Sequence, residues 1–254
     1  MQIIDTHAHI DQLEDLPQAL QRAHEAGVSD IVVMSVDLDS MKKLKGIVDQ
    51  YQRPNIHLGL GVHPGQIGAQ TRQSAIDFIR ANHAKARAIG ETGLDYWYKW
   101  ARKDEGERKK QKDFFAMHLD MALEFDLPIV IHSRGAWQDC LELTKAAGKV
   151  RALFHWYSGP VDILDQILDA GFYVSTGPSV AYSPESRRAM AHCPLGRILI
   201  ETDCPVRYKN GESFFTAEPK DVIKAWQALA QLKDLDEEKV LAIVNANAKE
   251  FFRI

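Results

Sequence analysis

Six side chains of the kind that bind metal ions follow short apolar runs that are far apart in the chain. Imidazole nitrogens and carboxylate oxygens are the donors that suit zinc, manganese and similar ions. Six such ligands can serve two ions if one carboxylate is shared and some positions stay open for water. We therefore predict two divalent ions, with Zn, Mn or Mg as the candidates and Glu91 as the shared ligand. The six predicted ligands are His7, His9, Glu91, His132, His155 and Asp203.

The pair His7 and His9 ends the first apolar run. Residues two apart in a strand face the same side, so both imidazoles can converge on one ion. Asp5 lies on the same face one step deeper, where a carboxylate could orient a ligand. An HxH pair is common by chance, however, and two solvated histidines near the N-terminus are the alternative interpretation.

Three further residues lie where they could serve the same site. Arg134 follows His132 by two and could hold an anionic oxygen with two hydrogen bonds, or form a salt bridge at the rim. His63 in GVHPG ends the third apolar run and is predicted to contact the substrate or a ligand. Glu201 should point inward beneath Asp203, where it either supports the metal site or pairs with an arginine or lysine.

The elements that must position these side chains alternate along the whole chain. Continuous apolar runs indicate strands buried on both faces, hence a parallel sheet, and the amphipathic stretches between them indicate helices. The predicted strands are Ile3–Ile10, Asp30–Val36, Ile56–Val62, Ala86–Glu91, Pro128–His132, Ala152–His155, Phe172–Thr176 and Arg197–Asp203. The predicted helices include Leu16–Ala26, Ser74–His83, Lys109–Phe125, Trp137–Ala147, Val161–Ala170 and Pro184–Ala191. Eight such units favour a closed (β/α)8 TIM-type barrel over an open sheet, with the active site at the carboxyl ends of the strands.

The rest of the chain is predicted to complete this barrel rather than to form a second domain. The sequence has no linker and no repeat beyond the strand–helix period, so residues 1–254 are predicted to be one domain. Pro205–Pro219 is polar and irregular and is predicted to be a loop. Two further helices follow, Lys220–Leu232 and Asp236–Phe252, and the last is expected to pack on the barrel exterior.

Composition restricts the kind of protein further. The 254 residues are 45% hydrophobic and carry 31 basic against 35 acidic side chains, a net charge of −4 that argues against nucleic-acid binding by bulk charge. Three widely spaced cysteines favour a reducing compartment over a disulfide framework. The sequence shows neither a signal peptide nor an apolar run of the ~18 residues that span a membrane. We expect a cytoplasmic monomer.

A run rich in basic residues, Lys99–Lys112, follows the aromatic residues Trp97 and Tyr98 and includes Trp100. Most of such a run is usually a solvated helix surface. Because it comes soon after Glu91, it could also form a basic and aromatic rim that holds a nucleic-acid strand by phosphate contact and base stacking.

With these residues placed, the chain resembles the TatD family of metal-dependent deoxyribonucleases, within the amidohydrolase-like barrels. The matching motifs occur in order along nearly the full chain: DTHAHID at 5–11, GVHP at 61–64, GETGLDY at 90–96, IHSR at 131–134, FHWYSG at 154–159, ETDCP at 201–205 and NAKEFF at 247–252. The resemblance implies a first ion bound by His7, His9, Glu91 and Asp203, and a second bound by Glu91, His132 and His155. The chain departs from the family pattern around the expected substrate, at Gly65, Trp156-Tyr157 and Val206-Arg207.

The predicted reaction is hydrolysis of a phosphodiester bond, in DNA before other substrates, by a water that two ions activate. Asp203 is predicted to be the general base, and Arg134 and His63 to hold the phosphate. Metal-activated water also serves other hydrolases on this scaffold, so an ester, lactone, amide or aminoacyl-tRNA bond is the alternative substrate. A metal-binding interaction protein without catalysis is the second alternative.

Overall fold

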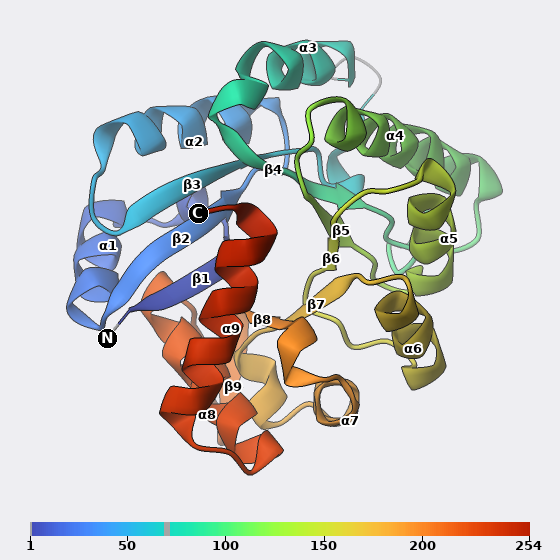
Figure 1. Cartoon of the computed structure of the whole chain (residues 1–254). Coiled ribbons are helices and arrows are strands. Elements are labelled where there is room, and N and C mark those ends of the chain that lie inside the picture. Colours follow the sequence, from blue (N-terminus) through green and yellow to red (C-terminus); the bar gives the residue numbers. More distant parts are fainter. Residues whose placement is uncertain (1, 69–71) are drawn as a thin grey trace.

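Eight parallel strands form a barrel in the computed structural model, which describes residues 2–68 and 72–254 (Figure 1). Each strand pairs with the next in chain order, and a bridge between Ala8 and Cys204 ties the first strand to the segment after the eighth. The strands are β1 (Ile3–Ala8), β2 (Val28–Met34), β3 (Asn55–Leu60), β4 (Ala86–Gly93), β5 (Ile129–His132), β6 (Ala152–Phe154), β7 (Tyr173–Thr176) and β8 (Ile198–Ile200).

All eight predicted strands are present, and the (β/α)8 prediction is confirmed, with differences at the strand ends. β4 continues past Glu91 to Gly93, whereas β8 stops at Ile200, so Asp203 lies in the segment after β8. The strands are buried on both faces, which is why their apolar runs are continuous. One apolar cluster fills the barrel interior, and a larger one lies between the strands and the helices.

The helices surround the barrel and return the chain from the end of one strand to the start of the next. They are α1 (Leu16–Glu25), α2 (Leu38–Gln50), α3 (Arg72–Asn82), α4 (Glu105–Glu124), α5 (Trp137–Ala147), α6 (Val161–Asp169) and α7 (Pro184–His192), followed by α8 (Val222–Lys233) and α9 (Glu237–Phe252). Of these, α2 was not among the predicted helices. It begins after Asp37, whose side chain accepts a hydrogen bond from the Ser40 backbone N–H.

The C-terminal helix α9 packs differently from the prediction. Its first half, including Val240 and Val244, joins the outer apolar layer as expected. Phe251 and Phe252 instead join the cluster inside the barrel, with residues such as Ile4 of β1. Figure 1 shows α9 crossing the end of the barrel that faces the viewer. The helix therefore closes the amino-terminal end of the strands and leaves the opposite end to the functional residues.

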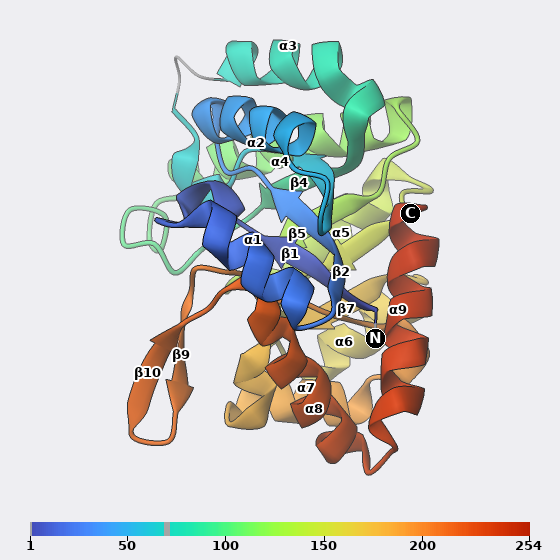
Figure 2. The ribbon, with the colours of Figure 1, turned by 90° about the vertical axis from the view of Figure 1, so that its left-hand side faces the viewer.

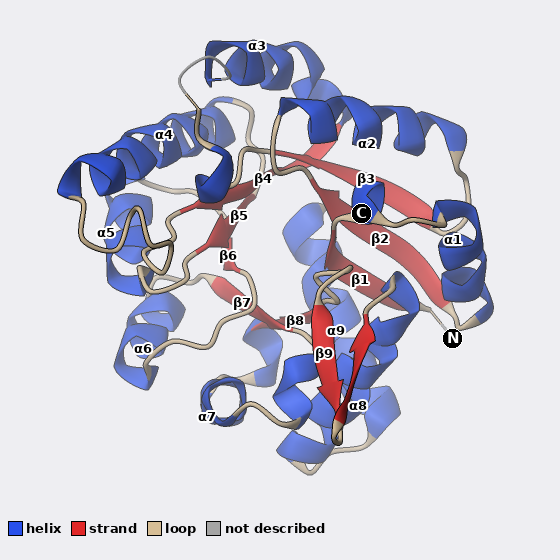
Figure 3. Cartoon of the chain, turned by 180° about the vertical axis from the view of Figure 1, so that it is seen from behind, coloured by secondary structure: helices blue, strands red, loops and turns tan. Residues whose placement is uncertain are grey.

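The segment Pro205–Pro219, predicted to be an irregular loop, contains a two-stranded antiparallel hairpin formed by β9 (Arg207–Asn210) and β10 (Ser213–Thr216). The hairpin stands away from the barrel body (Figure 2) and lies at the end opposite α9 (Figure 3). The sequence pattern did not indicate these strands, because three of the four β10 side chains are exposed and no alternation of buried and exposed residues results. Among the helices of the described residues, none is both long and apolar enough to cross a membrane.

Candidate metal centre

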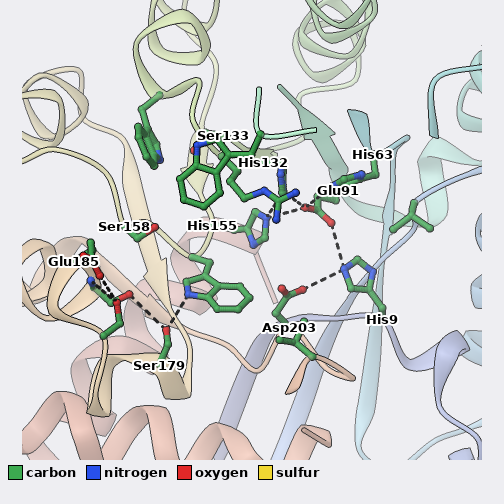
Figure 4. A pocket seen from close by; sticks show the side chains of 18 of the residues that line it. His9, His63, Glu91, His132, Ser133, His155, Ser158, Ser179, Glu185 and Asp203 are labelled. Atoms are coloured by element: carbon green, nitrogen blue, oxygen red, sulfur yellow. Dashed lines mark hydrogen bonds and ion pairs between the residues drawn. The ribbon is translucent and has the colours of Figure 1, made fainter. Parts of the chain in front are cut away.

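The six predicted ligands come together at the carboxyl end of the barrel. His7 belongs to β1 and His9 follows it, Glu91 belongs to β4 and His132 ends β5. His155 directly follows β6, and Asp203 lies three residues after the end of β8. All six are buried except His132, which is partly exposed. Figure 4 shows Glu91 between His9 on one side and His155 on the other.

The first group of donors faces Glu91 Oε2. His9 Nε2 lies 3.2 Å from this oxygen and 3.2 Å from Asp203 Oδ1, and His7 Nε2 lies 3.5 Å from both oxygens. The two Nε2 atoms are 3.3 Å apart. Ligands bound tetrahedrally to one ion at about 2.0–2.2 Å lie roughly 3.3–3.6 Å from each other. The spacing of His7 Nε2, His9 Nε2 and Asp203 Oδ1 therefore fits a single cation, and Glu91 Oε2 lies beside both histidines.

The second group faces the other oxygen of the same carboxylate. His132 Nδ1 and His155 Nε2 each lie 2.8 Å from Glu91 Oε1, and these two nitrogens are 3.3 Å apart. The short distances to Glu91 are those of hydrogen bonds, so the imidazoles share protons with the carboxylate. A cation bound here would take the place of those protons. One carboxylate with an oxygen in each group is the arrangement that a shared ligand requires.

Two of the predicted ligands are oriented through their second ring nitrogen. His9 Nδ1–H donates to the carbonyl oxygen of Met34 at 2.8 Å, which leaves the lone pair of Nε2 directed at the first group. His132 Nε2 lies 2.9 Å from Asp95 Oδ2, which directs Nδ1 at the second group. Carbonyl and carboxylate partners of this kind fix the ring orientation and the tautomer of metal-binding histidines.

The electrostatics of the cluster favour ionised carboxylates. Burial alone would raise the pKa of Glu91, but His155 and His63 beside it outweigh burial and hold that pKa well below its ordinary value. Burial would likewise lower the pKa of His155, yet Glu91 and Glu201 raise it well above the ordinary value. The pKa of Asp203 is lowered, against burial, by His9 and other neighbouring histidines. Buried negative charge of this kind attracts cations, whether protons or metal ions.

Asp203 owes its position to the segment after β8. Its backbone has φ +49°, a left-handed conformation that aspartate tolerates better than most residues. Its N–H donates to His7 O at 2.9 Å, and the Tyr208 hydroxyl of the hairpin donates to Thr202 O at 2.8 Å. Asp5 contacts the predicted ligand His7 through the backbone, because His7 N–H donates to Asp5 Oδ1 at 3.4 Å, and Thr202 N and Oγ1 also donate to its carboxylate. Asp5 therefore joins the segment to β1.

His63 lies beside the second group, with Nε2 3.8 Å from Glu91 Oε1. Gly65 N–H donates to His63 Nδ1 at 2.9 Å, so the proton of the neutral ring is on Nε2. Burial, together with the nearby His132, lowers the pKa of His63 to about 3. His63 therefore presents a neutral N–H donor toward the centre.

Arg134 forms a salt bridge, which was one of its two predicted roles. Its partner is Asp95, a residue that the sequence pattern did not indicate. Arg134 Nε and Nη2 donate to Asp95 Oδ2 at 2.8 and 2.7 Å, and the guanidinium lies over the Tyr98 ring at 5.3 Å. Asp95 therefore contacts both Arg134 and His132. The motif GETGLDY contains it, but it lies beyond the end of β4, where the strand pattern gives no signal.

The centre opens into a cavity of about 990 Å³ with an aromatic and hydroxyl-rich wall. The wall includes Trp97, Tyr98, Trp137, Trp156, Tyr182, Ser158, Ser179, Ser183 and Ser186. Trp156 has φ +42°, and its indole N–H donates to Ser179 Oγ at 2.9 Å. Of the run Lys99–Lys112, no described residue lines the cavity, and Lys109, Lys110 and Lys112 form ion pairs with acidic side chains. This part of the run is an ion-paired surface.

Comparisons with known proteins agree with this architecture. Residues 4–253 match the family model described as TatD related DNase. The chain is 30% identical over 261 residues to the uncharacterized metal-dependent hydrolase YabD of Bacillus subtilis, covering 99% of each chain. It is 26% identical over 262 residues to human deoxyribonuclease TATDN3, covering 98% of this chain and 94% of that protein. The crystal structure of YjjV, a TatD homolog from Escherichia coli, superposes with a TM-score of 0.89 at 24% identity, covering 99% and 98% of the two chains.

Proposed function

The chain belongs to the TatD family of related DNases, and from this membership we propose that it is a metal-dependent hydrolase that cleaves phosphodiester bonds in DNA. One observation carries the proposal: the two oxygens of Glu91 face two separate groups of donors at the open end of the barrel. The fit of the donor spacing to cations, and the buried negative charge, both support metal binding.

We propose that His7, His9, Asp203 and Glu91 Oε2 hold one divalent ion and that His132, His155 and Glu91 Oε1 hold another. Zn, Mn and Mg are the candidate ions. When bound, two such ions lower the pKa of a water molecule and neutralise charge on the attacking and leaving oxygens.

The side chains of the cavity supply the remaining steps. Asp203 has one oxygen toward His7 and His9, and its carboxylate is available as the general base that takes the proton of the attacking water. His63 Nε2–H and Arg134 line the cavity and donate to oxygens of the phosphate. Water is the nucleophile, so no covalent intermediate with the protein forms.

The test is hydrolysis by metal-stripped protein that is reloaded with Zn²⁺, Mn²⁺ or Mg²⁺ one at a time. End-labelled single-stranded and duplex DNA are the substrates, and shortened fragments are the expected products. Glu91→Gln should abolish cleavage because it weakens both groups, while Glu124→Gln, at an exposed ion pair with Arg80, should leave cleavage unchanged. No cleavage of DNA with any ion by the wild type would overturn the proposal.

A carboxylic ester, lactone, amide or aminoacyl-tRNA bond is the second candidate substrate, and the cavity lining favours it. Arg134 is the one lysine or arginine that lines the cavity in the described part of the chain, and it is already paired with Asp95. The serine-rich wall suits neutral polar groups. Aryl esters and lactones assayed beside DNA separate the two substrates. Ion binding without turnover of either would favour an interaction protein.

We also propose a cytoplasmic monomer. Cys140, Cys193 and Cys204 are unpaired and buried, which agrees with a protein that folds without disulfides. The molar mass in solution, measured by light scattering, tests the oligomeric state.

A further inference from the structure

Three buried polar atoms lie beneath the two groups of donors without a hydrogen bond to any described residue: His7 Nδ1, His155 Nδ1 and Glu201 Oε1. One ring nitrogen of each histidine and one oxygen of Glu201 lie within 4.8 Å of each other. His155 Nδ1 and Glu201 Oε1 are 3.5 Å apart. Buried polar atoms normally have hydrogen-bond partners. A cluster of three buried polar atoms without partners is explained if the carboxylate oxygen accepts hydrogen bonds from the two ring nitrogens.

The imidazole rings of His7 and His155 are stacked, and both direct Nε2 toward Glu91. His7 and His155 stack with their centroids 4.1 Å apart and an angle of 11° between their planes. The Nε2 atoms of both face Glu91, at 3.5 and 2.8 Å. A neutral imidazole that offers the lone pair of Nε2 carries its proton on Nδ1. With an ion bound at each Nε2, both histidines would therefore have an Nδ1–H that requires an acceptor on the side away from Glu91.

Glu201 is held in place to be that acceptor. Ser175 Oγ donates to its Oε2 at 2.6 Å, and its backbone N–H donates to Thr176 O at 3.1 Å. Its side chain is fully buried, and within residues 2–68 and 72–254 no lysine or arginine pairs with it, so the predicted alternative of such a pair is absent. A buried carboxylate without a cationic partner is costly unless hydrogen-bond donors surround it.

We propose that Glu201 is a positioning residue that accepts hydrogen bonds from the Nδ1–H groups of both His7 and His155, one ligand from each group, and so couples the binding of the two ions. The other orienting contacts differ, because Met34 O serves His9 alone and Asp95 serves His132 alone among the ligands. The inference rests on the two-ion centre of the proposed function and not on the identity of the substrate.

The test is titration calorimetry of metal-stripped protein with Zn²⁺ and with Mn²⁺. Glu201→Leu should weaken both binding steps by about 10–100-fold, the range for loss of a group that orients a ligand. Glu201→Gln keeps a neutral acceptor and should restore both steps in part. Asp95→Asn is the matched control, because it should weaken one step and leave the other within about twofold. Weakening of one step alone by Glu201→Leu would overturn the inference.

A second readout observes the hydrogen bonds directly. In Zn-loaded protein with ¹⁵N-labelled histidine, Glu201→Gln should shift the Nδ1 resonances of both His7 and His155. If Glu201→Leu does not fold, Ser175→Ala can replace it, because this variant removes the hydroxyl that donates to Glu201. Ser175→Ala should weaken the binding of both ions by the same factor. Binding of fewer than two ions by the wild type would refute the two-ion centre itself. If the wild type binds two ions but Glu201→Gln shifts the Nδ1 resonance of only one histidine, only the role of Glu201 would be refuted.

Discussion

Glu91 and Asp203 are both buried carboxylates among histidines, yet their surroundings differ in a way that supports different proposed roles. Each oxygen of Glu91 faces a different group of donors, so this residue is held from both sides. Asp203 is the more exposed of the two and lies after β8 in a segment that Tyr208 and Asp5 hold in place. A carboxylate that binds an ion through one oxygen and faces the cavity with the other can accept a proton from a water molecule there.

Asp203→Asn should therefore separate ion binding from turnover. The amide oxygen can still bind a cation, but it cannot take a proton from water at neutral pH. We expect much of the metal content to remain and kcat for DNA to fall by about 10²–10⁴-fold, the usual range for loss of a general base. Metal analysis and single-turnover cleavage with saturating ion measure the two effects. Full activity in this variant would remove Asp203 from the role.

At the scale of elements, the sequence predicts the strands well because each is a continuous apolar run ended by a polar residue. The same pattern is sufficient to place Glu91, His132 and His155 at or near the ends of their strands. It missed Asp95, because the position of this residue depends on contacts with His132 and Arg134, which are distant in the chain. It missed the hairpin because both of its strands are short and three of the four β10 side chains are exposed. It also could not indicate that Trp156 adopts a left-handed backbone, since nothing local requires this.

The contact between β4 and β5 leaves no room for a side chain at Gly93. This residue has φ +138°, and an added Cβ would lie 2.1 Å from His132 O. Gly93→Ala should lower the free energy of unfolding by roughly 2–6 kcal/mol, the sum of backbone strain and overpacking. Gly46→Ala, in helix α2 with open space around it, should instead raise stability by about 0.5–1 kcal/mol. Urea unfolding of both variants measures the difference, and equal stabilities would contradict the packing argument.

For the whole molecule, the centre connects residues from opposite ends of the chain, from His7 to Asp203. An unfolded chain cannot hold these donors together, so ions that bind the centre stabilise the folded state. Each ion present at about 100 times its Kd should add about 2.7 kcal/mol. Thermal melting with Zn²⁺ or Mn²⁺ and with chelator should show a higher Tm with ion. Glu91→Gln should remove most of this increase, and an increase of the same size in that variant would locate the ions elsewhere.

Stability should also depend on pH through a histidine outside the centre. His118 in α4 is fully buried, and its Nδ1–H donates to Phe114 O at 2.9 Å. Burial lowers its pKa to about 4, below the ordinary 6.5. The unfolded chain therefore binds the proton more readily, so stability is complete above pH 6.5 and is lost as pH falls toward 4.

Between pH 7 and pH 5 this loss should amount to about 2 kcal/mol for one group. His118→Leu, which keeps a side chain of similar bulk in the same apolar site, should show a pH dependence weaker by that amount. Urea unfolding at both pH values, with chelator in all samples, keeps the contribution of the centre equal in the two proteins. Parallel pH dependences would mean that His118 is protonated as easily in the folded chain as in the unfolded one.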